Sequence, residues 1–154
     1  MLTYREFTAL DLLDMSLPNL DEHTYSFTPD FYFRYLHGHA KYCLSVFSDS
    51  ANIGYIIGNS GVYKDTKMLY SHVTALSIAQ EFRRHGIGRR LLKLYEMNAK
   101  RDRSEFIDLF VKESNKVAID FYMKCGYIIH ERIIDYYSNP TEDAFDMRQY
   151  TPEH

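Results

Sequence analysis

The sequence of 154 residues has no tryptophan, only two cysteines and no long apolar run. Cys43 and Cys125 stand alone, without the paired spacing of zinc sites or disulfide-rich domains, so we expect free thiols in a reducing compartment and no bound metal. No apolar stretch approaches the ~20 residues that cross a bilayer, and the N-terminus lacks the apolar core of a signal peptide. These absences predict a cytoplasmic protein that does not enter a membrane.

Excess charge of one sign is missing as well. The formal net charge is -3 at pH 7, which argues against the broad basic surface of a nucleic-acid-binding protein. Basic residues gather only in the stretch EFRRHGIGRR (81–90), so any bound anion should be small. The length fits one domain over residues 1–154, and the chain contains neither repeats nor low-complexity tracts.

Aromatic side chains are plentiful. Fourteen Tyr and ten Phe make up 16% of the chain, more than a core of this size needs, which predicts an aromatic-lined site or a partner surface. In a short helix starting after Pro29, apolar side chains cover nearly the whole circumference. They are Phe31, Tyr32, Phe33, Tyr35 and Leu36. Such a helix needs cover on more than one side, either from the protein core or from a partner.

Hydrophobic patterns predict an α/β (α+β) order of elements. Strands are predicted over residues 2–7, 42–48, 52–61, 68–79, 105–111, 127–137 and 144–150, and helices over residues 9–15, 30–42, 87–103 and 116–125. Thr8, followed three residues later by Asp11, resembles a capping box that opens the first helix. Asn115 or Ser114 can cap the last one, which ends at Gly126.

The stretch EFRRHGIGRR lies between a strand and an amphipathic helix. A helix N-terminus carries unpaired N–H groups and positive partial charge, and Gly86 and Gly88 would let the backbone approach a phosphate closely. It is not a Walker A loop, because no Gly-Lys-Ser/Thr follows, and it lacks the dinucleotide pattern GxGxxG. Taken alone, the stretch also fits a solvated, charged helix start.

Its context resembles a known family. The pattern R-x-x-G-x-G from Arg83 follows VTALSI (73–78) and is followed some 30 residues later by Asn115 and by FYMKCGY (121–127), which resembles the GCN5-related N-acetyltransferase (GNAT) family. The resemblance spans residues 1–150. It implies a single mixed central sheet of about seven strands flanked by about four helices. It also implies that backbone amides at the turn from strand 4 to helix 3 bind the pyrophosphate of acetyl-CoA.

Longer strings resemble the catalytic subunits of N-terminal acetyltransferase B (NatB) complexes. They include HVTALS, EFRR, DLFV, DYYS and EDAFDMR. This resemblance implies acetyl transfer to the α-amino group of nascent chains that begin Met-Asp, Met-Glu, Met-Asn or Met-Gln. It further implies a helical auxiliary subunit that docks at the ribosome, and no direct contact with nucleic acid.

The resemblance assigns cofactor and catalytic roles. Backbone groups of Leu76 and Ile78 hold the pantetheine arm, where a strand distortion aims an N–H at the thioester oxygen as an oxyanion donor. Tyr122 lies near the sulfur as proton donor to the leaving thiolate or as substrate ligand, with core packing as its alternative. The remaining cofactor contacts are Arg83, Arg84, His85, Gly86, Ile87, Gly88 and Asn115. For Asn115, helix capping explains the residue equally well.

Substrate contacts are predicted on the strands and loops around this site. Strand alternation would place His72, Thr74, Leu76 and Ile78 on one side, next to the glycine turn. His72 is the candidate for reading the second residue of the substrate, by a hydrogen bond or as an imidazolium; its alternative is a histidine satisfied at a strand end. Alternation also sends Tyr136 and Tyr137 to opposite faces, unless a bulge intervenes.

One loop departs from the family pattern. The resemblance makes Tyr25 close over the substrate together with the tyrosine pair of the last hairpin. The family typically carries a Glu two residues before this tyrosine, whereas this shorter loop has His23 there, and Glu22 is the candidate substitute. Two other functions therefore stay open: an N-terminal acetyltransferase of different sequence preference, and a non-catalytic module that binds CoA.

Overall fold

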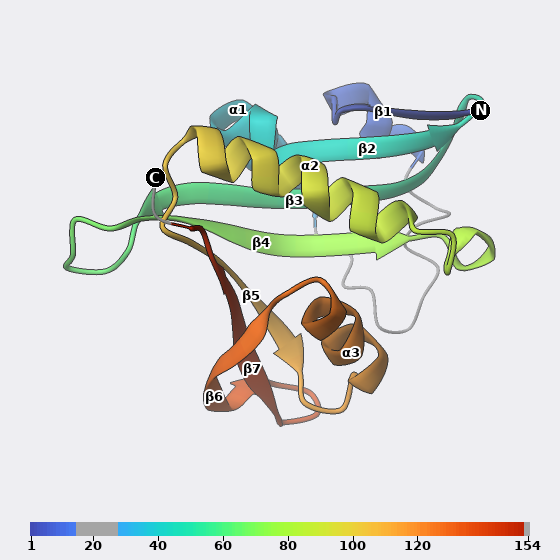
Figure 1. Cartoon of the computed structure of the whole chain (residues 1–154). Coiled ribbons are helices and arrows are strands. Elements are labelled where there is room, and N and C mark those ends of the chain that lie inside the picture. Colours follow the sequence, from blue (N-terminus) through green and yellow to red (C-terminus); the bar gives the residue numbers. More distant parts are fainter. Residues whose placement is uncertain (15–27, 153–154) are drawn as a thin grey trace.

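The computed structural model describes residues 1–14 and 28–152, which form one seven-stranded sheet with helices on both faces (Figure 1). The elements are β1 (Leu2–Glu6), η1 (Ala9–Asp14), α1 (Pro29–His39), η2 (Ala40–Tyr42), β2 (Cys43–Ser48), β3 (Ala51–Val62), β4 (Leu69–Ile78), η3 (Gln80–Phe82), α2 (Ile87–Arg101), β5 (Phe106–Lys112), α3 (Lys116–Lys124), β6 (Ile128–Tyr137) and β7 (Glu142–Tyr150), where η denotes a 3-10 helix. The strand order is β1-β2-β3-β4-β5-β7-β6, and among these described strands only β4 and β5 pair in parallel. The predicted mixed sheet of seven strands is confirmed.

The first predicted helix differs from the expectation. Residues 9–14 form a 3-10 helix, so the described part of the chain has three α-helices rather than four. The Thr8 N–H donates to the Asp11 carboxylate over 2.7 Å, as in a capping box, but the Arg5 guanidinium also donates to both oxygens of that carboxylate at 2.8 Å. This tether to β1 holds a segment too short to gain from α-helical hydrogen bonding.

Two apolar layers lie on opposite faces of the sheet. One lies under α2, whose buried residues recur with the helical period: Ile87, Leu91, Leu92, Tyr95 and Ala99. The other layer lies under α1, where Tyr32 packs with Phe7 and Tyr55. The aromatic helix is therefore largely covered by the core, and only Phe33 among its aromatic side chains is mostly exposed, at 51%.

Cys43 is buried, Cys125 is half-buried, and both are free thiols, as predicted. Within the described residues, no helix has the length and apolar character to cross a lipid bilayer.

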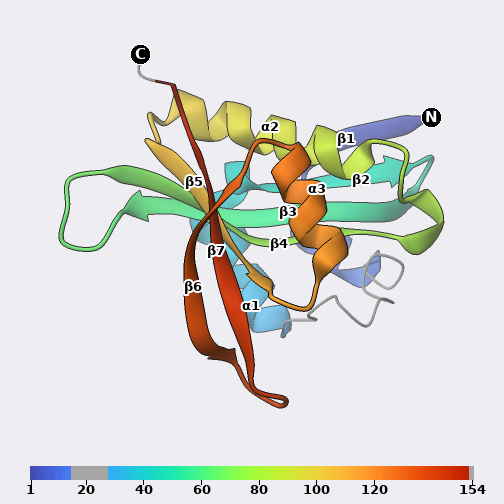
Figure 2. The same cartoon turned by 60° about the horizontal axis from the view of Figure 1, so that its bottom comes forward.

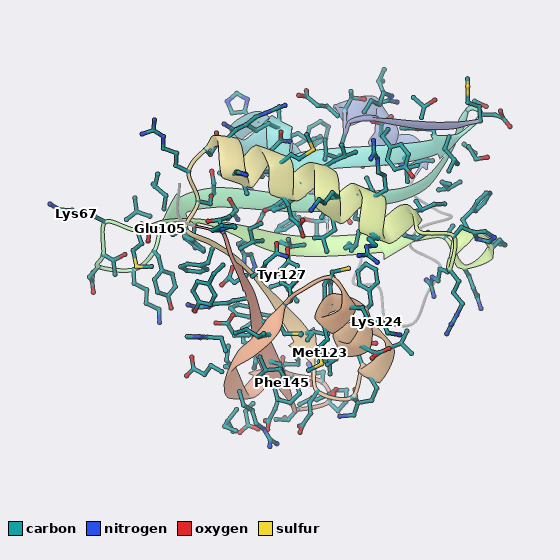
Figure 3. The ribbon with its side chains drawn as sticks, in the orientation of Figure 1. Lys67, Glu105, Met123, Lys124, Tyr127 and Phe145 are labelled. Atoms are coloured by element: carbon teal, nitrogen blue, oxygen red, sulfur yellow. The ribbon has the colours of Figure 1, made fainter. Side chains whose placement is uncertain are left out.

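The parallel pair β4 and β5 separates partway along its length. Tyr70 to Val73 of β4 pair with Phe106 to Leu109 of β5, and beyond this point the strands diverge (Figures 1 and 2). Figure 3 labels Glu105 at the joined end, where its N–H donates to the Leu69 carbonyl at 2.8 Å. In the part of the chain that the structure describes, the last residues of β4 thus have no strand partner on the β5 side.

A β-bulge in β4 lies at the point of divergence. Ile57 of β3 is opposite Ala75, whereas the next residue, Gly58, is opposite Val73, so Thr74 is an extra residue in β4. The extra residue reverses the alternation of side chains beyond it, because each strand position normally switches face.

This reversal makes one prediction wrong. Leu76 and Ile78 pack against the α2 layer, whereas Ala75 packs against the α1 layer. His72 and Thr74 flank a core residue of the α2 layer and therefore lie on the opposite, α1 face. The four residues predicted to share one side are thus divided, two on each face of β4.

Tyr95 of α2 holds the bulge from the other side of the sheet. Its hydroxyl donates to the His72 carbonyl at 2.7 Å, and the side chain is fully buried. Gly58 leaves the room that this contact needs, because a Cβ there would lie 2.2 Å from the Tyr95 hydroxyl oxygen and 2.3 Å from the His72 carbonyl oxygen. The bulge is therefore built from three elements, β3, β4 and α2.

We predict that Gly58→Ala lowers the free energy of unfolding by about 1–3 kcal/mol, because the added methyl group overlaps backbone as well as a buried ring. Chemical denaturation measures this. Gly61→Ala, on the same strand, is the matched control, since its Cβ would meet only the Tyr70 ring at 4.0 Å. Equal stability of the two variants would contradict the packing described for the bulge.

Candidate active site

The turn that opens α2 has the geometry of an anion site. Gly86 is the N-cap in a left-handed conformation, with φ of 77°, and no side chain among residues 1–14 and 28–152 caps the helix. The Arg90 N–H donates to the Gly86 carbonyl at 3.0 Å, which is the first bond of the helical ladder. The N–H groups of residues 87–89 therefore lack a helical carbonyl partner, and they lie at the positive end of the helix dipole. A phosphate group is a suitable acceptor for them.

The arginines beside this turn differ in their roles. Arg83 Nε donates to the Ile78 carbonyl at 2.8 Å, so this side chain fastens the end of β4. Arg84 borders a shallow hollow of about 490 Å³ whose other walls come from α3 and include Lys116. His85 is exposed, with Nδ1 3.3 Å from the Phe82 carbonyl oxygen. Lys116 was not predicted, because its sequence position carries no phosphate-binding pattern.

Helix α3 borders the diverging strands and carries two predicted residues. Asn115 Oδ1 accepts from the Ala118 N–H at 3.2 Å, so this residue caps the helix. Tyr122 is 9% exposed, and its ring packs edge-on against Phe121 and Tyr127, with centroids 5.2 and 5.8 Å away. Burial raises the pKa of Tyr122 above its usual value, so the phenol stays protonated at neutral pH. It can therefore donate a proton as well as pack.

On the opposite face of β4, His72 forms a dyad with Asp108 of β5. His72 Nδ1 and Asp108 Oδ1 are 2.7 Å apart, and Asp108 is 3% exposed. An ionised carboxylate only accepts, so Nδ1 carries the hydrogen and Nε2 remains for another partner. The ring also packs on Phe110, 5.1 Å between centroids. The alternative to substrate contact is a histidine whose hydrogen bonds are all made within the fold. Among the described residues, this alternative applies to Nδ1 but not to Nε2.

Of the two tyrosines of the last hairpin, Tyr136 lies next to this dyad, and Tyr137 packs on Tyr136. The β6–β7 register shifts between Ile133 and Tyr137, and Asp135 has a φ of 54°, so the bulge that would change their alternation is present. Tyr136 packs on Phe110 and on Tyr137, with ring centroids 5.0 Å apart in both pairs. Burial raises the pKa of Tyr137 to about 12. Both phenols are therefore neutral hydrogen-bonding groups beside the opening between the strands.

Thr74 is linked to helix α1 across the same face. Its Oγ1 and the Tyr35 hydroxyl are 2.9 Å apart, and Asn59 Nδ2 donates to that hydroxyl at 3.0 Å. Tyr35 was assigned to the aromatic helix without a role at the site; its position there depends on long-range packing. The predicted substrate residues Glu22, His23 and Tyr25 lie outside the described residues.

The site thus has two faces that meet at the bulge of β4, one with a glycine turn and one with a histidine–aspartate dyad. A profile of the "Acetyltransferase (GNAT) family" matches residues 8–127. This chain belongs to the GNAT acetyltransferases. The three α-helices and the seven-stranded sheet of the described residues have the architecture of that fold.

Individual relatives show to which group of GNAT acetyltransferases the chain is similar. This acetyltransferase is 41% identical, over 94% of its length and 83% of the relative's, to the N-terminal acetyltransferase B complex catalytic subunit naa20 of Schizosaccharomyces pombe. The crystal structure of Chaetomium thermophilum Naa20 in complex with a bisubstrate analogue superposes with a TM-score of 0.91 at 33% identity, covering 96% of this chain and 86% of that one. A NatB complex bound to CoA and MES superposes at 0.89 with 29% identity over 97% and 99% of the chains. The acetyltransferase therefore belongs with the NatB catalytic subunits.

We predict that Gly86→Val weakens acetyl-CoA binding by at least about tenfold, because a β-branched residue in the left-handed region costs roughly 1–2 kcal/mol and shifts the turn. Isothermal titration calorimetry measures the dissociation constant. Gly86→Asn is the control for conformation, since asparagine tolerates positive φ, and it should lose less. Unchanged affinity in Gly86→Val would show that the turn does not hold the cofactor.

Proposed function

We propose that this acetyltransferase transfers the acetyl group of acetyl-CoA to the α-amino group of proteins beginning Met-Asp, Met-Glu, Met-Asn or Met-Gln. It does so as the catalytic subunit of a NatB-like complex, with a helical auxiliary subunit that brings it to nascent chains at the ribosome in the cytoplasm. The observation that carries the proposal is the arrangement of β4. An anion site follows the strand on one face, and a hydrogen-bonding dyad precedes its bulge on the other.

The cofactor lies along the diverging end of β4. The N–H groups of residues 87–89 bind the pyrophosphate, and Arg84 and Lys116 add positive charge at the rim. The backbone of Leu76 and Ile78, which has no strand partner towards β5 among the described residues, binds the pantetheine arm. A backbone N–H of this segment stabilises the oxyanion that forms when the amine attacks the thioester carbonyl.

Little base strength is required of the protein. An α-amino group has a pKa of ~8, so roughly a tenth of it is already neutral at pH 7, and completing the deprotonation is worth only ~1.4 kcal/mol. Holding the amine against the thioester supplies ~7 kcal/mol or more. Catalysis by this site is therefore mainly a matter of placing the two substrates.

Tyr122 is the proton donor for the leaving thiolate. The phenol is protonated at neutral pH, and its buried ring is held on α3 between Phe121 and Tyr127. As the C–S bond breaks, the phenol donates its proton to the sulfur, and the proton released by the amine returns to the site through solvent.

The polypeptide enters on the face of the dyad. His72 Nε2 is the group that contacts the second residue, and Tyr136 and Tyr137 form the neighbouring aromatic wall. A carboxylate or carboxamide at the second position offers an acceptor to an imidazolium, and a carboxamide also offers a donor to the neutral ring. This supports a preference for Asp, Glu, Asn and Gln over small residues.

We predict that, with the auxiliary subunit present, peptides beginning Met-Asp and Met-Glu are acetylated with a higher kcat/KM than peptides beginning Ser or Ala. A panel differing only at its first two residues measures this. If peptides beginning Ser or Ala were preferred, the chain would be an N-terminal acetyltransferase of another sequence specificity, and the proposed specificity would be wrong. Acetyl-CoA binding without turnover of any peptide would favour the non-catalytic module instead.

We predict that Tyr122→Phe lowers kcat by roughly a hundredfold, the usual effect of losing a general acid, with little change in the affinity for acetyl-CoA. Steady-state kinetics at saturating cofactor measures kcat. Tyr127→Phe is the matched control, because Tyr127, labelled in Figure 3, is buried at the end of α3 and its hydroxyl bonds Glu96. Equal kcat in the two variants would remove Tyr122 from the proton transfer.

A further inference from the structure

We propose that Asp108 is a positioning residue that sets the hydrogen-bonding state of His72 Nε2, so that the choice between acidic and amide second residues depends on pH. The inference rests on the proposed function, in which His72 contacts the second residue of the substrate. The buried aspartate thereby gains a role, and pH becomes the condition under which substrates with an acidic second residue and substrates with an amide second residue differ in rate.

The geometry fixes the orientation of the imidazole. His72 and Asp108 are direct neighbours in the parallel register of β4 and β5, on the last rungs before the strands diverge. The 2.7 Å contact holds Nδ1, and Phe110 packs against the ring. The side chain of His72 is 21% exposed, whereas that of Asp108 is 5% exposed. Solvent and substrate therefore reach the imidazole and not the carboxylate.

Few other charges act on the dyad. The titratable and charged groups around Asp108 are Tyr70 from β4, Tyr95 from α2, Tyr136 from β6, and Asp146 and Arg148 from β7. Arg148 is already paired with Asp146, at 3.0 Å. Among the described residues, His72 is the one basic side chain within ion-pair distance of Asp108. A buried carboxylate stabilises a cation at this distance more strongly than an exposed one does.

The two protonation states present different atoms to the substrate. With Nδ1–H bonded to Asp108, the neutral ring offers a lone pair at Nε2, and the imidazolium offers an N–H there. A substrate carboxylate only accepts, so it requires the imidazolium. A carboxamide accepts from the imidazolium through its oxygen, or donates its NH2 to the neutral ring after a flip of the amide. Acidic substrates thus depend on the protonation of His72, and amide substrates do not.

The experiment compares Met-Asp and Met-Asn peptides that are otherwise identical, with the NatB-like complex and acetyl-CoA. The ratio of their kcat/KM values cancels the titration of the α-amine and any pH effect on cofactor binding. From pH about 6 to about 9, the ratio is expected to fall by about tenfold, the usual value of one charge-assisted hydrogen bond. A constant ratio with both peptides active overturns the inference and leaves the proposed function intact.

The variant Asp108→Asn keeps a hydrogen-bonding group of the same shape and removes the charge. An amide can donate to Nδ1 as well as accept from it, so Nε2 is no longer held in one hydrogen-bonding state, and the fall in the ratio is expected to shrink or disappear. Asp49→Asn is the matched control: it removes the same charge at an exposed turn and should leave the pH profile unchanged. A profile in Asp108→Asn identical to that of the parent overturns the inference. If the Asp108→Asn variant acetylates the Met-Asn peptide, its site still folds. If the unmodified enzyme acetylates neither peptide, the proposed function is refuted, and the inference is refuted with it.

Discussion

The hydrogen bond from Tyr95 to the His72 carbonyl holds the bulge on which the whole site depends. It joins α2 to β4 just before Thr74, and Gly58 provides the space for it. Without the extra residue, the side chains of β4 would keep one alternation along the whole strand. With it, His72 and Thr74 lie on the α1 face, whereas Leu76 and Ile78 pack on the α2 face. One local irregularity thus divides the residues of β4 between the two faces of the candidate site.

The two faces of the site also differ in the sign of their local charge. The glycine turn concentrates backbone dipoles and basic side chains at the end of β4, although the whole chain is mildly acidic. The opposite face contains a buried carboxylate that is matched to a single imidazole. Local geometry, rather than net charge, therefore decides what each face attracts. This is consistent with a small anionic cofactor on one side and a peptide on the other.

The sequence predicted the features that depend on neighbouring residues. The element order, the glycine turn and the Asn115 cap follow from local patterns, and the structure confirms them. The resemblance implies a strand distortion near Leu76 and Ile78, but the residues of β4 alone do not place a bulge at Thr74, because register is decided by a partner strand. Asp108 was also missed, although a signal existed: a charged residue in the apolar stretch FIDLFV requires a buried partner. Which residue is that partner follows only from the pairing of β4 with β5.

The abundance of tyrosine and phenylalanine has two structural reasons. Part of it fills the layer between α1 and the sheet, where Tyr32 packs with Phe7 and Tyr55. Another part continues beside His72 and Asp108, from Phe110 to Tyr136 and on to the adjacent tyrosine. Aromatic rings are stiff, since they have only two side-chain torsions, so they can hold an imidazole in place without further hydrogen bonds. The same residues that stabilise the sheet therefore also preorganise the site, and a substitution among them should affect folding and specificity together.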